Sequence, residues 1–259
     1  MKLFKYSVMT LLGFMLATTA AEADSRLKNI LNTGVLRVGT TGDWNPMTMK
    51  DPATNSYKGY DIDMMTDLAK DLGVKVEFVA TDWKTLVSGV VSNKYDLTGS
   101  ASISMKRAKV AGYSPSYFSL ATVPLTLKKN LSRFRDWGDL DKPNVTVAAT
   151  LGTTQEQQVK QFFPNAKKKI IEAPARDFQE VLAGRADAHI TSNVEAGKLV
   201  EKYPQMAVVP VKKARARTPI AMLLPQDDQV WINYINHWIA LKKERGLFDK
   251  LAAKWQIAN

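Results

Sequence analysis

Short apolar runs alternate with amphipathic segments along most of the chain. The runs at 35–40, 74–80 and 95–98 have the length and the β-branched content of buried strands. Between them, the segments 60–72 and 84–92 repeat apolar residues every three or four positions, which predicts helices. The order strand, helix, strand, helix, strand is typical of a mostly parallel α/β sheet.

The second half of the chain repeats this order with different residues. We predict strands at 123–128, 145–149, 169–171, 188–191 and 220–224, and helices at 154–163, 178–183, 193–202 and 228–245. No glycine–serine linker separates the two α/β units, so we expect the chain to cross from the first unit to the second and to return. Ligands bind such sheets where strands end and helices begin, which places the expected site in a cleft between the units.

The N-terminus has the pattern of a secretory signal. Lys2 and Lys5 precede an apolar run, and Ala-Glu-Ala at 21–23 fits the small-x-small pattern that signal peptidase accepts. We predict a signal peptide of residues 1–23, cleavage after Ala23 and a periplasmic product. The apolar run is too short for a good membrane span, and the alternative is an anchor that stays in place.

Composition excludes several kinds of site. The 259 residues include no cysteine, which rules out disulfides, thiolate metal sites and cysteine chemistry. The two histidines, His189 and His237, lack the spacing of metal ligands, so we expect no metal and no cofactor. The formal charge is +11, but its lysines and arginines form scattered groups without interleaved aromatic residues, which favours solvated faces over nucleic-acid binding.

An arginine follows a run of small hydroxyl residues in the first unit. Ser100, Ser102 and Ser104 alternate with Ala101 and an isoleucine, so in an extended strand their hydroxyls share one face. Just beyond them lies Arg107, and a guanidinium can donate two parallel hydrogen bonds to a carboxylate. The alternative is a surface arginine near a helix start.

A second candidate anion site lies in the second unit. The stretch ATLGTTQEQQ, residues 149–158, runs from a predicted strand through a glycine into a helix that Thr153 or Thr154 opens. The free N–H groups of such a helix start attract an anion. The alternative is an ordinary capped helix start with Glu156 or Gln157 completing a capping box. One carboxylate binder in each unit would hold one ligand between them.

Six stretches, in this order, resemble the periplasmic solute-binding proteins of the polar amino acid family, the bacterial extracellular solute-binding proteins of family 3. They are GVLRVGTTGDWNPM, YKGYDIDMMTDLAKDLG, SASISMKRAKVAGYSPSYF, GTTQEQ, GRADAHITSNVEA and LKKERGLFDKLAAKW. The resemblance covers essentially the whole mature chain. Within the family the sequence is similar to the cyclohexadienyl dehydratases, exported enzymes that remove water and carbon dioxide from prephenate or arogenate.

The resemblance implies an α/β fold of two lobes, the type II periplasmic-binding-protein fold. Each lobe would hold a mostly parallel sheet flanked by helices, with the ligand cleft between them. Lobe 1 would comprise 24–120 plus 214–259 and lobe 2 would comprise 121–213, with hinge crossings near 118–121 and 213–218. The implied partners are a small carboxylate-bearing ligand and the membrane subunits of an ABC importer.

The resemblance also implies roles for individual residues. Arg107 would hold the ligand α-carboxylate, and Trp44 and Trp83 would form walls of the side-chain pocket, although partial core packing is the alternative for each tryptophan. Hydroxyl residues would assist the arginine: Ser100, Ser102, and the helix-capping Thr154 with Thr153 as its neighbour.

One departure from the family concerns the ligand amine. The family aspartate that pairs with the ligand ammonium is replaced by Ser192, within the phrase Thr191-Ser192-Asn193. A serine offers a hydrogen bond but no charge, so Glu195 or Asp43 would have to supply the anion. Otherwise the ligand is a carboxylate without an α-amine, or one whose cation lies elsewhere.

The dehydratase alternative depends on Glu195, which aligns with the acid that protonates the departing hydroxyl in those enzymes. General-acid chemistry needs a carboxyl group that stays protonated near the working pH. Two positions differ from the enzymes, because Thr122 replaces an active-site lysine and Thr150 replaces an asparagine. We therefore favour a binding protein without catalysis, and keep the dehydratase as the alternative.

Overall fold

The computed structural model describes residues 25–257. The predicted signal peptide and its cleavage site lie outside this range. No helix within the described residues has the length and apolar character needed to cross a membrane.

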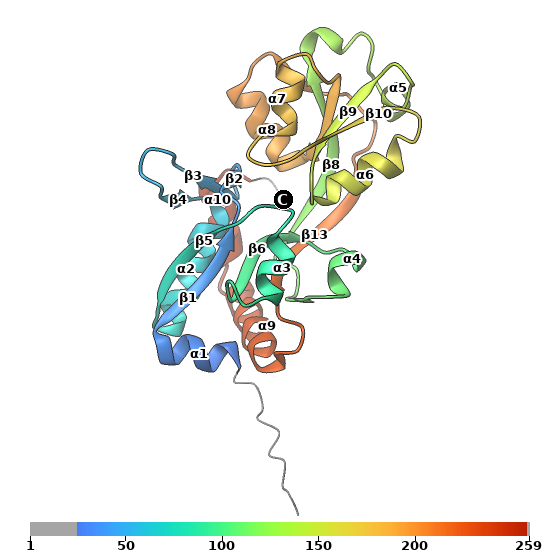
Figure 1. Cartoon of the computed structure of the whole chain (residues 1–259). Coiled ribbons are helices and arrows are strands. Elements are labelled where there is room, and N and C mark those ends of the chain that lie inside the picture. Colours follow the sequence, from blue (N-terminus) through green and yellow to red (C-terminus); the bar gives the residue numbers. More distant parts are fainter. Residues whose placement is uncertain (1–24, 258–259) are drawn as a thin grey trace, which may run out of the picture.

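The centre of the molecule is one ten-stranded mixed sheet (Figure 1). Eight strands lie in the order β10-β9-β11-β8-β13-β6-β1-β5, while β12 pairs with β8 and β7 pairs with β13. The strands are β1 (Val35–Thr40), β5 (Lys75–Ala80), β6 (Leu97–Ser102), β7 (Gly112–Tyr113), β8 (Phe118–Leu127), β9 (Thr146–Thr150), β10 (Lys167–Ile171), β11 (Ala188–Ser192), β12 (Met206–Val208) and β13 (Arg215–Leu224). A separate three-stranded sheet, which the sequence did not predict, consists of β2 (Asp43–Trp44), β3 (Thr48–Lys50) and β4 (Tyr57–Lys58).

The expectation of mostly parallel sheets is only partly right. Strand β1 is parallel to β5 and β6, and β9 is parallel to β10 and β11. The two long strands β8 and β13 are antiparallel to each other and to β11 and β6. Because they run in opposite directions through the middle of the sheet, they join two parallel halves into one mixed sheet.

The helices fall into two groups at the two ends of the sheet (Figure 1). One group is α1 (Arg26–Thr33), α2 (Tyr60–Leu72), α3 (Leu86–Val91), α4 (Met105–Ala108), α9 (Gln229–Glu244) and α10 (Leu247–Lys254). The other is α5 (Trp137–Leu140), α6 (Thr154–Phe162), α7 (Asp177–Leu182) and α8 (Asn193–Lys202), with a short 3₁₀ helix, η1 (Lys128–Asn130), at the end of β8. Strands β8 and β13 run between the two groups.

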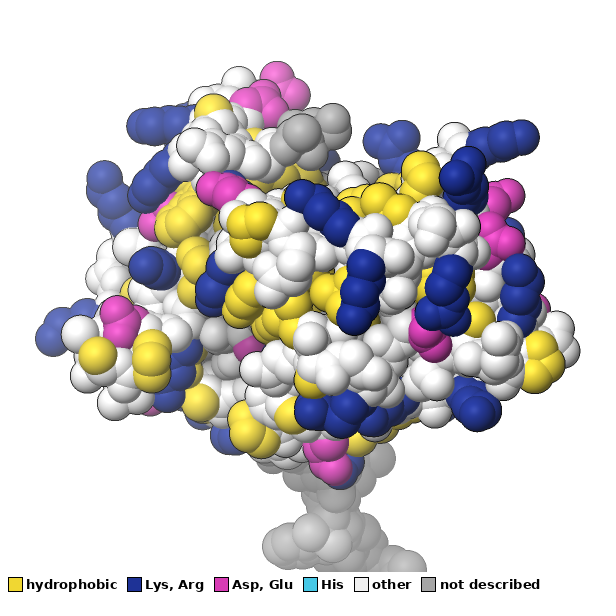
Figure 2. All heavy atoms as spheres, turned by 90° about the horizontal axis from the view of Figure 1, so that it is seen from above, with side chains coloured by type: hydrophobic (Ala, Val, Ile, Leu, Met, Phe, Trp, Pro, Cys, Tyr) yellow, Lys and Arg dark blue, Asp and Glu magenta, His cyan; other side chains and the backbone are white. Residues whose placement is uncertain are grey.

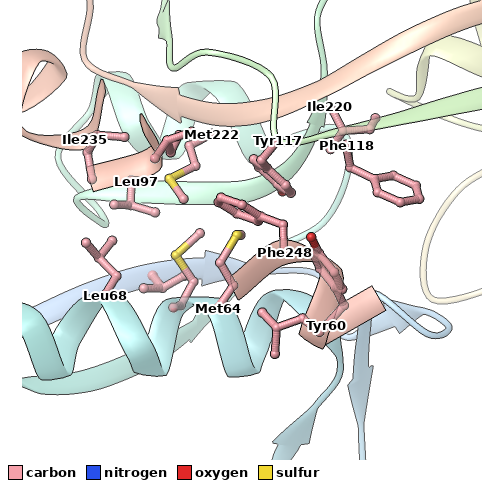
Figure 3. Packing of buried hydrophobic residues seen from close by; sticks show 14 of the residues in the cluster. Tyr60, Met64, Leu68, Leu97, Tyr117, Phe118, Ile220, Met222, Ile235 and Phe248 are labelled. Carbon is pink, nitrogen blue, oxygen red and sulfur yellow. The ribbon is translucent and has the colours of Figure 1, made fainter. Parts of the chain in front are cut away.

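Each end of the sheet has its own hydrophobic core. Figure 3 shows the largest cluster, in which Met64 and Leu68 of α2 face Leu97 of β6, Ile235 of α9 and Phe248 of α10. At the other end, one cluster gathers around β9 and α6, and another around β8, α7 and α8. The two ends are therefore stabilised largely by separate apolar contacts.

Basic side chains are spread over the surface. The face shown in Figure 2 carries lysine and arginine side chains in many separate places, with acidic side chains between some of them. This distribution is the one expected for solvated faces.

Candidate functional site

A pocket lies between the two groups of helices and takes its lining from both. It encloses ≈ 440 Å³, which includes part of the solvent at its mouth. Nine predicted site residues line it: Trp44, Trp83, Ser100, Ser102, Arg107, Thr150, Thr153, Thr154 and Glu195. Five further lining residues were not predicted: Gln155, Arg176, Asp177, Ile190 and Thr191.

Arg107 is buried in the pocket wall. Ser104 caps the N-terminus of the short helix α4, which carries the arginine. The Nη1 of Arg107 donates to the carbonyl oxygen of Ser102 at 3.2 Å, and the Nη2 of Arg107 donates to the carbonyl oxygen of Gly152 at 3.1 Å. The side chain is only 8% exposed, so the alternative of a surface arginine is wrong. Burial lowers the pKa of Arg107, and no acidic side chain among residues 25–257 forms an ion pair with it.

The start of helix α6 approaches the pocket from the opposite side. Thr153, rather than Thr154, is the N-cap, because its Oγ1 accepts from the N–H of Glu156 at 3.2 Å. The preceding Gly152 has φ +80°, and a Cβ there would lie 2.6 Å from the Cα of Lys84. Only glycine fits this turn, which brings the end of β9 against the loop that carries Trp83.

Arg176 links three groups at the pocket. It lies just before α7, and its Nη2 is 2.9 Å from Oε1 of Glu195. Its Nη1 lies 3.2 Å from Oδ2 of Asp43 and also donates to the Asp43 carbonyl oxygen. Both carboxylates that could have met a ligand ammonium are therefore already paired with this guanidinium.

Two tryptophans form the neighbouring wall, and Asp43 contacts one of them. The indole N–H of Trp83 donates to Oδ1 of Asp43 at 3.1 Å. The rings of Trp44 and Trp83 meet edge to face with centroids 5.8 Å apart. Both tryptophans line the pocket and also contact the main core. Packing against the core is therefore compatible with a place in the pocket wall for these two residues.

The electrostatics of Glu195 combine opposing effects. Burial raises the pKa of the Glu195 carboxyl, while the Arg176 guanidinium and a hydrogen bond donated by the Thr191 hydroxyl oppose the rise. Burial alone would lower the pKa of Arg176, but Glu195 and Asp43 raise it above its usual value. The Arg176 guanidinium is therefore held charged, and it offsets part of the effect that burial has on the pKa of Glu195.

Asp177 is a second buried carboxylate on the pocket lining. Its Oδ1 accepts from the N–H of Phe178 at 2.9 Å, and its Oδ2 lies 3.4 Å from Nδ1 of the fully buried His189. Burial acts to raise the pKa of Asp177, but His189 holds it below its usual value. Within residues 25–257, no three His, Asp or Glu side chains cluster as metal ligands would.

Four predicted residues do not line the pocket. Asp43 contacts it only through Arg176 and Trp83. The Thr122 hydroxyl donates to Oε1 of Gln158 at 2.9 Å, and Ser192 caps α8 by accepting from the N–H of Glu195. Asn193 accepts from the N–H of Ala121 at 2.9 Å, which ties the start of α8 to strand β8.

Comparisons with known proteins show the family of this chain. The profile of the family "Bacterial extracellular solute-binding proteins, family 3" matches residues 36–258. Cyclohexadienyl dehydratase of Pseudomonas aeruginosa is 29% identical over 257 residues, covering 98% of this chain and 95% of that protein.

Two solved structures extend the comparison. An ancestral amino acid-binding protein, a precursor of cyclohexadienyl dehydratase, is 37% identical with a TM-score of 0.82, covering 89% of this chain and 99% of that one. A binding component of an ABC transporter from Wolinella succinogenes, complexed with lysine, is 30% identical with a TM-score of 0.79, covering 87% and 97%. The chain belongs to the bacterial extracellular solute-binding proteins, family 3.

Proposed function

We propose that this chain is the substrate-binding protein of an amino acid ABC importer and that it holds the carboxylate of its ligand on Arg107. The buried guanidinium of Arg107 carries the proposal. A buried charge is costly unless it meets a counter-charge, and the hydrogen bonds to Ser102 and Gly152 reach only neutral carbonyl oxygens. Of the five N–H donors of a guanidinium, several remain for a ligand carboxylate.

The start of α6 adds to this anion site from the other end of the molecule. The first N–H groups of a helix have no partner within the helix, and they carry a partial positive charge. Thr153 and Thr154 stand at this start and line the same pocket as Arg107. A carboxylate held there would be bound from both ends at once.

The same observations support two lobes joined by a hinge, with 24–120 plus 214–259 as one lobe and 121–213 as the other. Strands β8 and β13 are the connections, and their pairing is irregular between Arg215 and Thr218. Ala216, inside this irregular stretch, has φ +45°. This break in regular strand pairing supports a hinge near 213–218, because domain closure needs backbone freedom. The other proposed crossing, near 118–121, keeps regular pairs at Phe118, Ser119 and Leu120.

The pocket favours a ligand with an uncharged side chain. Arg176 is already paired with both Glu195 and Asp43, and His189 stands beside Asp177. A cationic side chain would therefore have to displace a tethered guanidinium from two carboxylates. The edges of Trp44 and Trp83 provide apolar walls instead. In this respect we infer that the chain differs from the lysine-bound relative.

Export belongs to the same proposal. The family consists of extracellular solute-binding proteins, and an importer needs its binding protein outside the inner membrane. We infer that residues 1–23 direct export to the periplasm and are then removed.

A cyclohexadienyl dehydratase is the second candidate function, and the buried carboxyl of Glu195 is the observation that favours it. The raised pKa of Glu195 suits a general acid. The ion pair with Arg176 argues against this role, because it stabilises the ionised form of Glu195, which has no proton to donate. Purified protein incubated with saturating prephenate or arogenate decides the matter. Formation of phenylpyruvate or phenylalanine, lost in Glu195→Gln, would establish the enzyme, and no product would exclude it.

The binding proposal is tested by a thermal-shift screen with the standard amino acids. Ligand at a hundredfold excess over its dissociation constant stabilises a protein by about 2.7 kcal/mol, which such a screen detects. The stabilisation by the best ligand should disappear in Arg107→Ala and persist in Arg135→Ala, a control at an exposed arginine. Stabilisation that survives in Arg107→Ala would show that the carboxylate site is elsewhere.

A further inference from the structure

Arg176 joins the two ends of the molecule through its own side chain. It immediately precedes α7 at one end, and Asp43 begins β2 at the other end (Figure 1). Nη1 of Arg176 lies 3.2 Å from Oδ2 of Asp43 and also donates to the Asp43 carbonyl oxygen. Nη2 lies 2.9 Å from Oε1 of Glu195 in α8. One guanidinium thus contacts a carboxylate in each of the two proposed lobes.

Each carboxylate is oriented by a neighbour from its own lobe. Oδ1 of Asp43 accepts from the indole N–H of Trp83 at 3.1 Å, which leaves Oδ2 for the arginine. Oε2 of Glu195 accepts from the Thr191 hydroxyl, which leaves Oε1. Because both carboxylates already have a partner that fixes them, less side-chain entropy is lost when the contact across the cleft forms.

The burial of these side chains favours the contact across the cleft. Arg176 and Glu195 belong to the same proposed lobe, so their ion pair does not depend on closure, and their side chains are 10% and 9% exposed. The Asp43 side chain is 26% exposed, so the contact leaves part of this carboxylate hydrated. Closure therefore gains charge-assisted hydrogen bonds where solvent screens weakly, without the full cost of burying a third charge.

We propose that Arg176 is a positioning residue that holds the two lobes together through Asp43, and that this contact shifts the ligand-free chain toward the closed form. The inference rests on the proposed function, because it assumes two lobes and a hinge. A ligand that binds the closed form then has less of the equilibrium to shift. An uncharged amino acid can therefore close the chain without a cation that reaches both Asp43 and Glu195.

Distances between two spin labels, measured by double electron–electron resonance in the absence of ligand, test the inference. Labels at Lys94→Cys and Lys142→Cys, one at each end, report the ratio of closed to open chains. A hydrogen bond to a charged group changes an equilibrium by about tenfold or more. Arg176→Ala and Asp43→Asn should each lower the ratio by about that factor. The double variant should lower it no further than Arg176→Ala alone, because both changes remove one contact.

Lys84→Ala is the matched control, because the ion pair of Lys84 with Glu172 also joins the two ends, at 2.7 Å, but is exposed. It should leave the ratio nearly unchanged, because solvent screens this pair. Asp43→Asn keeps the ion pair between Arg176 and Glu195, so it gives a result even if Arg176→Ala does not fold.

Two results would overturn the inference alone, provided that a binding amino acid still shortens the distance between the labels. One is a ratio that is unchanged in both Arg176→Ala and Asp43→Asn, and the other is a ligand-free wild type with only the open distance. Identical distances in the wild type and every variant, with and without each standard amino acid, would overturn the hinge of the proposed function, and the inference with it.

Discussion

Two buried arginines face one pocket, and their surroundings assign them different roles. The charge of Arg176 is balanced by Glu195 and Asp43. Arg107 has no acidic partner among residues 25–257, and we propose that a ligand carboxylate supplies its counter-charge. The sequence indicated Arg107 through the serines before it, but nothing in the stretch around Arg176 marked that residue, whose partners lie 19 and 133 positions away.

Removing the guanidinium of Arg176 should change ligand choice. In Arg176→Ala, Glu195 and Asp43 lose their partner, and lysine or arginine as ligand could supply the missing cation. We predict that the affinity for lysine relative to the best uncharged amino acid rises about tenfold or more, since a desolvated hydrogen-bonded charge pair contributes about 1.5–3 kcal/mol. Competition binding measures the ratio, and Arg176→Lys, which keeps the charge, is the control. An unchanged ratio in Arg176→Ala would show that Arg176 does not exclude cationic side chains.

Asp61 should give stability a distinct pH dependence. Its folded-state pKa of about 7 lies above the unfolded value near 3.8, so the folded state binds the proton more tightly. The stability it contributes is full below about pH 4 and is lost as the pH rises through about 7. Urea unfolding between pH 4 and 8 should therefore show a steeper decline in the wild type than in Asp61→Asn. Parallel curves would contradict the raised pKa.

Helices and strands were predicted with the right bounds where a single apolar pattern spans the whole element. Strand β1 and helices α2 and α8 have the predicted bounds, because an apolar run or a regular repeat spans each of them. Strands β8 and β13 begin five residues earlier than predicted, at Phe118 and Arg215. In β13 the added residues include two arginines and a proline, whereas in β8 they alternate between buried and half-buried positions. These added residues pair β8 with β13 in the middle of the sheet. Periodicity did not predict them as strand, although the family resemblance implied chain crossings near 118–121 and 213–218.

The turn between β9 and α6 can be tested with a pair of glycines. Gly152 and Gly184 both have positive φ, but a Cβ at Gly152 would meet the Lys84 backbone whereas one at Gly184 meets nothing within 4 Å. Both alanine variants should lose about 1–3 kcal/mol of stability from backbone strain. Only Gly152→Ala should also lose ligand affinity, because its added methyl separates the two walls of the pocket. Calorimetric titration measures this, and equal affinities in the two variants would contradict the close approach.

At the scale of the whole molecule, the pocket exists only where the two ends meet. Arg107 bonds across to Gly152, Arg176 bonds across to Asp43, and an exposed ion pair joins Lys84 to Glu172 at 2.7 Å. The exposed pair should contribute little, because solvent screens it. If the two ends close on a ligand as proposed, we expect the buried contacts and the ligand to stabilise the closed form.

Closure can be followed with two dyes, because the chain has no cysteine to compete for labelling. Lys94→Cys with Lys142→Cys places one exposed label at each end, and Lys94→Cys with Lys70→Cys places both at the same end. Saturating ligand should change energy transfer in the first pair and leave the second unchanged. No change in the first pair would contradict a hinge at the β8 and β13 crossings.

A titration that varies the ligand carboxylate and Arg107 together tests whether Arg107 binds that carboxylate. The dissociation constants of the best amino acid and its carboxamide would be measured by calorimetry in the wild type and in Arg107→Ala. We predict that the wild type prefers the acid by at least tenfold and that Arg107→Ala loses most of this preference, since Arg107 carries the full positive charge at the proposed carboxylate site. An acid preference of the same size in Arg107→Ala would contradict it.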